Sequence, residues 1–260
     1  MQDFNPVILI EPVLFIAVGA VPVAYWRLRR KLAGTMLLFS LMAYAGAIAL
    51  KEVVQAFTLN SVTVQYGAVS WQTGLYYGLQ TCFFEVGLAY LVARYAVARK
   101  MMDASDAEGY GVSLGFWENA ILIGALALVN ITATYVMIAE GLLPQSIYQT
   151  LVSSSPGLFY PTSQLAPLIA LATLERVSSF LAHFAWGYLC VLSVCLKKPV
   201  YLAIALPMGL LDALVPFAQE LPLWEFEGII FALSLGFFVV SRVVTRSARR
   251  NSSQQILTNV

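Results

Sequence analysis

The sequence predicts an all-α membrane protein with seven transmembrane helices, an N-terminus outside the membrane and a C-terminus in the cytoplasm. Composition, the spacing of apolar stretches and the placement of basic residues lead to this prediction. Of the 260 residues, 60% are hydrophobic and 11% are charged, and the mean hydropathy is +0.77. Such a composition lies outside the usual range of soluble domains. We therefore expect an integral protein of the plasma membrane, in direct contact with lipid.

Seven stretches are long and apolar enough to cross a membrane. A hydrocarbon core about 30 Å thick requires roughly 20 consecutive apolar residues in a helix. Stretches of this kind lie approximately at 6–26, 33–58, 72–97, 112–139, 164–194, 199–218 and 226–243. They define a single transmembrane domain over 1–243, followed by a polar cytoplasmic tail over 244–260.

The basic residues orient these stretches. Lys and Arg collect in cytoplasmic loops, and here they follow the first, third, fifth and seventh stretches. Of the 15 basic residues, all except Lys51 and Arg176 lie in those places: Arg27, Arg29, Arg30, Lys31, Arg94, Arg99, Lys100, Lys197, Lys198, Arg242, Arg246, Arg249 and Arg250. The other connections contain no Lys or Arg, so the N-terminus is predicted to lie outside.

Charge and residue type exclude several classes. The net charge of +1 offers no basic face of the kind that nucleic-acid binding requires. Cys82, Cys190 and Cys195 fall within predicted spans, so we interpret them as small buried residues and not as a disulfide set. The last stretch, "GIIFALSLGFFVVS", lacks the lysine that a retinal Schiff base needs, and a retinal protein is therefore excluded.

Ionisable side chains inside the spans are the main signal of function. A charge at the bilayer centre costs about 2.5–3.5 kcal/mol on insertion scales, so each one needs a partner, water or a function. Glu85 lies near the middle of the third span and Glu118 in the first turns of the fourth. His183, the one histidine, lies in the fifth span and Asp212 in the sixth. Their similar depths predict a cavity formed by the third to sixth spans.

The remaining intramembrane charges have simpler explanations. We expect Lys51 and Glu52 to lie near the outer end of the second span, with the lysine side chain extending to the interface. Glu175 and Arg176 lie roughly two helical turns nearer the outside than His183. We interpret them as a structural pair between helices.

The fifth span presents a helical face around His183. Ser179 lies four residues before it and Gly187 four after it, so the three share one face. We expect Ser179 to orient the imidazole and Gly187 to leave room beside it. Gly111 and Gly115 repeat this spacing in the fourth span, where small residues allow a neighbouring helix to approach closely.

Two kinds of chemistry use buried carboxylates and a histidine. A proton-coupled transporter moves protons through them, but carriers usually contain an internal repeat and none is evident between the halves of this chain. Hydrolysis inside the membrane needs a general base to hold water and donors for the oxyanion, within a cavity shielded from lipid. A carboxylate can be that base, and a histidine can supply the proton or the oxyanion contact.

Four short motifs follow one another along the chain. They contain Glu85 in "CFFEVGLAYLVARY", Leu114 and Glu118 in "LGFWE", Arg176 and His183 in "RVSSFLAH", and Asp212 in "PMGLLDALV". Over about residues 80–215, their order resembles that in the superfamily of CAAX-processing proteases, PrsW and the YhfC-type intramembrane proteases. The seven-span anterior-pharynx-defective subunit of gamma-secretase also looks related. The first motif departs from the pattern, because Phe84 replaces one of two glutamates and neither Leu88 nor Ala89 is the expected arginine.

The resemblance implies a glutamate-dependent intramembrane protease that hydrolyses peptide bonds of a membrane-protein or peptide substrate. In such an enzyme Glu85 and Glu118 hold and activate water, and His183 and Asp212 stabilise the oxyanion. The supporting residues are Glu175, Arg176 and Ser179.

The metal requirement stays open at this point. Glu85, Glu118 and His183 form a mixed zinc site if a metal is used, but the chain shows none of the usual zinc-ligand spacings. The gamma-secretase subunit implies an alternative in which the same fold is a non-catalytic membrane scaffold or partner subunit. A proton-coupled transporter is the third alternative.

Overall fold

A computed structural model describes residues 4–29 and 32–258, with side chains as far as Thr245. Arg30 and Lys31, which contributed to the predicted orientation, lie outside the described residues. Every regular element within the described part is helical. In chain order these are η1 (Pro6–Leu9), α1 (Ile10–Leu28), α2 (Gly34–Tyr66), α3 (Trp71–Gln80), η2 (Thr81–Val86), α4 (Gly87–Ala98), α5 (Ala107–Phe116), η3 (Trp117–Ala125), α6 (Leu126–Ala139), α7 (Gln145–Ser154), η4 (Pro156–Phe159), α8 (Thr162–Cys195), α9 (Val200–Ala205), η5 (Leu206–Phe217) and α10 (Leu223–Thr258).

Seven helical spans among the described residues are long and apolar enough to cross a membrane, which confirms the predicted all-α, seven-span fold. Each overlaps one of the predicted stretches. The spans are Pro6–Leu28, Gly34–Tyr66, Trp71–Ala98, Ala107–Ala139, Thr162–Cys195, Val200–Phe217 and Leu223–Thr245.

The second span is longer than its hydropathy predicts. The apolar stretch ends near residue 58, whereas α2 continues to Tyr66, because polar residues such as Asn60 and Gln65 lower the hydropathy without breaking the helix. Gly67 ends it with a φ of 87°, a left-handed backbone conformation that glycine adopts readily. The fully helical length places Lys51 in the interior of α2 and not near its end.

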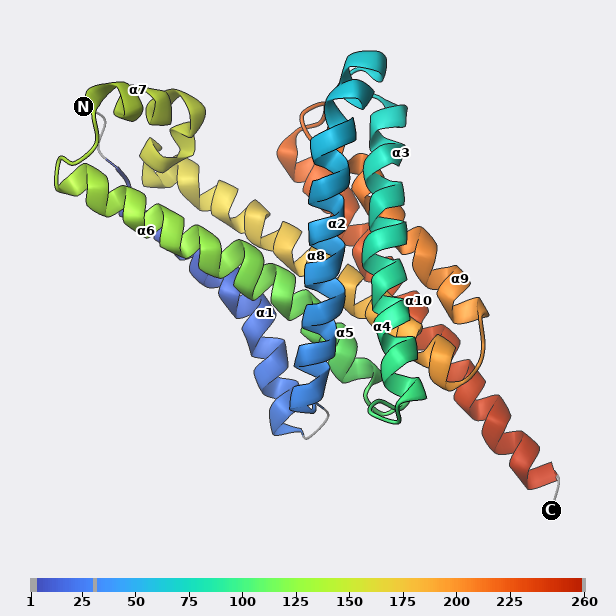
Figure 1. The fold of residues 1–260 in the computed structure, drawn as a ribbon. Coiled ribbons are helices and arrows are strands. Elements are labelled where there is room, and N and C mark those ends of the chain that lie inside the picture. The colour runs from blue at the N-terminus through green and yellow to red at the C-terminus, as the bar shows by residue number, and fades with distance from the viewer. Residues whose placement is uncertain (1–3, 30–31, 259–260) are drawn as a thin grey trace.

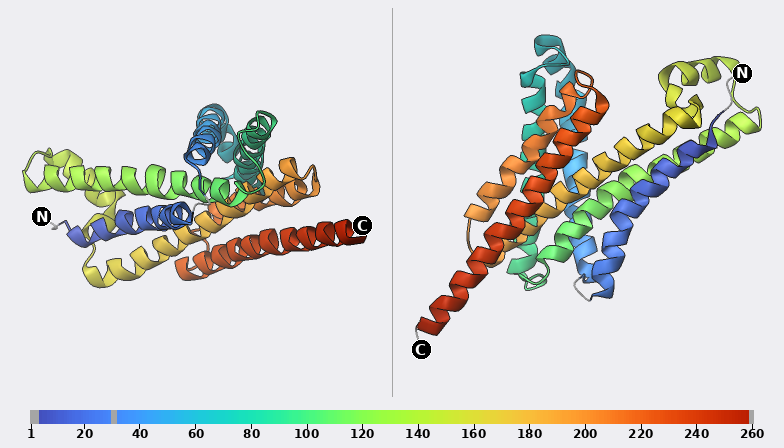
Figure 2. Two further views of the ribbon diagram at one scale, coloured as in Figure 1. Left: turned by 90° about the horizontal axis from the view of Figure 1, so that it is seen from below. Right: turned by 180° about the vertical axis from the view of Figure 1, so that it is seen from behind.

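The helices form two groups that diverge from a common region. In Figures 1 and 2, α1, α6 and α8 run side by side and oblique to α2 and α3, and α7 joins the far ends of α6 and α8. Asn5 ties the N-terminal segment to that connection, since its side-chain nitrogen donates to the carbonyl oxygen of Tyr160 at 2.8 Å. Figure 1 shows the two chain ends at opposite ends of the bundle, as an odd number of crossings requires.

Helix α8 is the centre of the bundle. In its most apolar window, 72% of the residues are buried inside the protein. It packs against α1, α4, α5, α9 and α10, and its second half from Ala182 to Ser193 is buried without interruption. Residues on α8 are therefore the ones most shielded from lipid.

Two glycines set the distance between α5 and α8. A Cβ atom added to Gly111 would lie 2.6 Å from the carbonyl oxygen of Phe184, and one added to Gly187 would lie 2.9 Å from the Cα of Gly111. This contact agrees with the expected close approach of small residues. The expectation that Gly187 leaves room beside the imidazole is wrong, because Gly111 and Leu114 of α5 fill that space.

The direction of insertion into the membrane stays a prediction, as does the domain boundary at residue 243. The described backbone continues as α10 through that boundary to Thr258.

The contact between α5 and α8 predicts opposite effects of one substitution at two helical glycines. Gly111→Ala should lower the free energy of unfolding by about 1–3 kcal/mol, the usual cost of overpacking, because the backbone of α8 cannot move aside cheaply. Gly236→Ala on α10 is the matched control, since no atom lies within 4 Å of its added Cβ and alanine favours helices. Unfolding midpoints of the purified variants in detergent measure both. Equal midpoints for Gly111→Ala and the unmodified protein would contradict this account of the packing.

Candidate active site

One cavity of about 290 Å³ lies where the two groups of helices meet. It contains every predicted site residue, and two further spans contribute to it through α2 and α10 in addition to the predicted third to sixth. The polar and charged residues that line it are Tyr44, Lys51, Glu85, Glu118, Glu175, Arg176, Ser179, His183 and Asp212.

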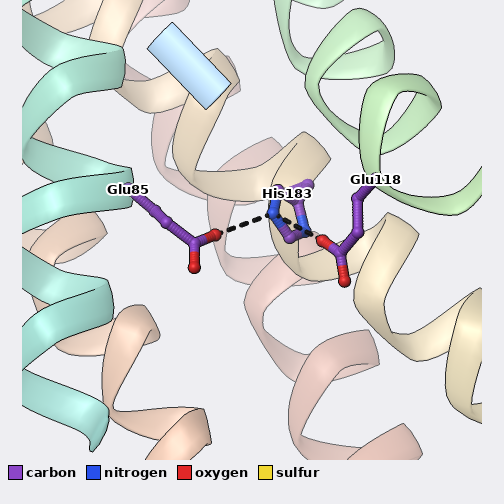
Figure 3. Close-up of side chains that lie close together, drawn as sticks. All are labelled: Glu85, Glu118 and His183. Carbon is purple, nitrogen blue, oxygen red and sulfur yellow. Dashed lines mark hydrogen bonds and ion pairs between the residues drawn. The ribbon is translucent and has the colours of Figure 1, made fainter. Parts of the chain in front are cut away.

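His183 lies between two glutamates from different spans. Its Nε2 atom is 2.8 Å from Oε2 of Glu118 and 3.0 Å from Oε2 of Glu85. Figure 3 shows the two carboxylates approaching the ring from opposite sides, one from η2 and the other from η3. All three side chains are largely buried, with His183 and Glu85 less than 10% exposed.

The contact of the other ring nitrogen, Nδ1, shows where His183 carries a hydrogen. Its Nδ1 atom lies 2.9 Å from the backbone carbonyl oxygen of Ser179, and the Ser179 hydroxyl lies at 3.4 Å. A carbonyl oxygen can only accept, so Nδ1 carries a hydrogen and donates it. Ser179 therefore contacts the imidazole as expected, but mainly through its main chain. Trp186, whose ring centroid is 4.2 Å from that of the imidazole, packs against the ring.

Lys51 belongs to this site, and the expectation that it extends to the interface beside Glu52 is wrong. Its Nζ atom lies 2.6 Å from Oε1 of Glu85, 2.8 Å from Oγ1 of Thr81 and 3.3 Å from Oδ2 of Asp212. The reason is the length of α2, which places Lys51 beside the middle of the neighbouring spans. Glu52 points away and is exposed.

Arg176 is the matching cation on the other side of His183. Its Nη1 donates to Oε1 of Glu118 at 3.3 Å, and its Nη2 donates to Glu175. The predicted pairing of Glu175 with Arg176 is present, but it lies within α8. The contact between helices is the one to Glu118, so Arg176 holds a site carboxylate and not a separate structural pair.

Together these contacts make a chain of alternating charge through the cavity. Each central glutamate uses Oε1 for a cation and Oε2 for the imidazole. Four carboxylates and two cations give a formal charge of −2 when the imidazole is neutral. The side chains of Asp212 and Glu175, at the two ends of the chain of charges, are 36% and 45% exposed, whereas those of Glu85 and Glu118 are 8% and 17% exposed. The members, in spatial order, are Asp212, Lys51, Glu85, His183, Glu118, Arg176 and Glu175.

The backbone that carries the acidic residues is unusual. Glu85 lies on the π-helical segment η2 and Glu118 on the π-helical segment η3. Asp212 lies on η5, a 3₁₀ segment of 12 residues that contains Pro207 and Pro216. π-helical turns are rare and occur frequently at functional sites, and 3₁₀ runs of this length are uncommon.

The central three side chains fit a divalent metal ion. One donor atom from each of Glu85, Glu118 and His183 lies within 4.8 Å of the other two. One imidazole nitrogen and two carboxylate oxygens are ligands that zinc accepts, with a position left for water or substrate. Two further features agree with a metal ion at this place. The formal charge of the cavity is negative, and the hydrogen bond from Nδ1 of His183 leaves Nε2 as the ligand atom.

Sequence reasoning missed Lys51, Tyr44 and Thr81 as parts of the site. The signal for Lys51 was present, because it is one of two basic residues outside the loop pattern. Thr81 and Tyr44 gave no signal, since hydroxyl groups are common within spans. All three cysteines are free, as expected.

Fold and site together define an integral membrane protein with an enclosed centre of two carboxylates and one imidazole. The model of the YhfC intramembrane metalloprotease family matches residues 13–221, and the chain belongs to this family. The matched range contains every residue of the alternating chain. Comparison with curated proteins and with solved structures gave no match. The suspected relation to the YhfC-type superfamily is confirmed.

The three-residue donor set predicts binding of one zinc ion per chain. His183→Ala and Glu118→Gln each remove a ligand and should therefore weaken zinc binding strongly. Loss of a residue that only hydrogen-bonds to a ligand typically costs about 10–100-fold in affinity, so loss of a ligand should cost more. Competition with a chromogenic chelator measures the affinity on purified protein. Glu52→Gln, one residue from Lys51 but outside the cavity, should bind like the unmodified protein. Unchanged affinity in His183→Ala would contradict the assigned donor set.

Proposed function

We propose that this chain is a zinc-dependent intramembrane endopeptidase of the plasma membrane, with its N-terminus outside. The observation that carries the proposal is the convergence of one oxygen from each of two glutamates on Nε2 of His183 inside a buried cavity. Membership in a family described as intramembrane metalloproteases supports it. The reaction is hydrolysis of a peptide bond in a membrane-protein substrate.

Glu85, Glu118 and His183 are the residues that hold the metal in this proposal. Bound there, zinc supplies a Lewis acid for the scissile carbonyl and lowers the pKa of a water molecule. The chain's own contribution is to keep the three ligand atoms together and away from lipid. Ser179 fixes the imidazole through Nδ1, so that Nε2 faces the carboxylates.

The two glutamates have different surroundings, and we assign them different tasks. Glu85 is 8% exposed and its Oε1 accepts from Lys51 at 2.6 Å, whereas Glu118 is 17% exposed and its Oε1 accepts from Arg176 at the longer distance of 3.3 Å. A general base must reach the proton that it takes. In this proposal both glutamates would hold the metal through Oε2, and Oε1 of Glu118 would be the atom that accepts a proton from the attacking water, while Glu85 is a positional ligand only.

The oxyanion role fits Arg176 better than the residues first expected. In this arrangement His183 has no donor left, since Nδ1 already donates to Ser179, and Asp212 as an ionised carboxylate only accepts. Arg176 lines the cavity and carries five N–H donors. Among the residues that the structure describes, it donates to Glu118 and Glu175 alone. Its remaining donors are available to a substrate carbonyl oxygen.

The rest of the cavity wall indicates the kind of substrate. Beyond the chain of charged residues the wall is apolar and is supplied by five spans. An unfolded stretch of a transmembrane segment, with apolar side chains beside the scissile bond, matches this lining. The residues are Ile48, Leu122, Ile123, Ala182, Trp186, Leu211, Val215, Phe226 and Ile230.

Cleavage of reporter proteins that carry different transmembrane segments tests the enzyme directly. In cells expressing the unmodified chain at least one reporter should be cut, and Glu118→Gln should reduce that cleavage by about 10²–10⁴-fold, the usual contribution of a general base. His183→Ala and a membrane-permeant zinc chelator should abolish it, while Glu52→Gln should cut normally. Unfolding midpoints confirm that each variant is folded.

Persistent cleavage by folded Glu118→Gln or His183→Ala would reject this mechanism. If no reporter is cut and reconstituted vesicles instead show solute-dependent proton movement, the chain is a transporter. Silence in both assays, with a stable partner protein recovered, would favour the non-catalytic scaffold.

The role of Arg176 has its own test. Arg176→Lys keeps a positive charge beside Glu118 but has fewer donors, so kcat should fall by about 10²–10³-fold, as on loss of an oxyanion donor, while zinc affinity and KM change little. Kinetics on a cleaved reporter in detergent measure this separation. A lysine variant with full kcat would remove Arg176 from the oxyanion contact.

A further inference from the structure

We propose that Lys51, together with Thr81 and Asp212, is a clamp that positions the Glu85 carboxylate so that only one of its oxygens faces the metal-binding atoms. Lys51 is thus a positioning residue and not a catalytic one. This inference rests on the proposed zinc-dependent function and assigns the residues that prepare its ligand set.

The clamp uses every hydrogen of the lysine ammonium group. An ammonium has three N–H donors, and Lys51 places its Nζ within 3.3 Å of three oxygens, on Glu85, Thr81 and Asp212. The Thr81 hydroxyl in turn donates to the Asp212 carboxylate. Thr81 and Glu85 lie one turn apart on η2, Asp212 lies on η5 and Lys51 on α2. The clamp therefore joins the second, third and sixth spans at one point.

The consequence for Glu85 follows from which oxygen is held. Lys51 contacts Oε1 at 2.6 Å, and Oε2 is the atom that lies 3.0 Å from Nε2 of His183. The terminal torsion of a glutamate side chain has a broad energy profile, so an unheld carboxylate would present either oxygen or both. The clamp thereby selects one oxygen as ligand before a metal ion arrives.

Asp212 gains a different role from the one that the sequence predicted. Its carboxylate contacts Lys51 and Thr81, whereas His183 contacts Oε2 of Glu85. As the counter-ion of Lys51, it compensates the charge of the ammonium group that Glu85 alone would otherwise balance. A carboxylate in this position holds the lysine on the η5 side and keeps its other two donors directed at η2.

A second explanation makes the opposite prediction. If Lys51 were only a nearby positive charge, its removal would change the formal charge of the cavity from −2 to −3 and tighten the binding of a divalent cation. If Lys51 positions Glu85, its removal weakens binding, because outer partners of metal ligands typically contribute 10–100-fold to affinity. Whether zinc binding becomes tighter or weaker without Lys51 therefore distinguishes an effect of its charge from an effect on the position of Glu85.

The experiment compares zinc dissociation constants of the full chain, purified in detergent, by chelator competition. Lys51→Met has a similar length but no donors, and its Kd should rise by about 10–100-fold. Lys51→Arg, which restores charge and donors, should recover most of the affinity. Glu52→Gln is the matched control on the neighbouring residue of the same helix and should leave the Kd unchanged.

Thr81→Val is the second variant and keeps the pair of Lys51 with Glu85, so it tests the clamp even if Lys51→Met does not fold. Valine is close in shape to threonine but lacks the hydroxyl group, so the Kd should rise by several-fold to about 10-fold, and the unfolding midpoint shows whether the variant is folded. An equal or lower Kd in folded Lys51→Met, or in Thr81→Val, would overturn the clamp while leaving the zinc enzyme in place. Absence of stoichiometric zinc in the unmodified chain would overturn both.

Discussion

The contact of His183 with two glutamates is the interaction on which the rest of the structure depends. Two carboxylates within about 3 Å of one nitrogen repel each other strongly in a medium of low dielectric constant. A cation, Lys51 or Arg176, supports each carboxylate from behind, and a positive charge between the two, on a bound ion or on a protonated imidazole, would offset their repulsion. A divalent metal ion supplies such a charge, and the alternating order of charge from Asp212 to Glu175 extends the compensation outward.

Apolar contacts between the helices bring these charged groups together. The close contact at Gly111 and Gly187 sets α5 against α8, so that η3, which continues α5, presents Glu118 to the imidazole. The π-helical turns in η2 and η3 place both glutamates on widened turns that face the cavity. The charged site therefore lies next to the close apolar contact between α5 and α8.

Much of this could be predicted from the sequence, and the rest could not for identifiable reasons. Hydropathy predicted seven spans, and the cost of burying charge pointed to Glu85, Glu118, His183 and Asp212, which the structure places in one cavity. Lys51 was misplaced because helix length was judged from apolar length. The π-helical turns have no sequence signature, and the direct partner of each charge depends on helix rotation, which a linear pattern does not contain. The cation that pairs with Glu85 is Lys51 from another span and not a residue that follows Glu85 along its own span.

The central claim is that one imidazole and two carboxylates from three spans bind a single divalent ion inside the membrane. X-ray absorption spectroscopy at the zinc edge, on the protein purified after zinc loading, tests this most directly. The account predicts one zinc per chain with a first shell of nitrogen and oxygen atoms and outer-shell scattering from a single imidazole, lost in the His183→Ala variant. Sulfur in the first shell, or an imidazole signal that survives the loss of the one histidine in the chain, would contradict it.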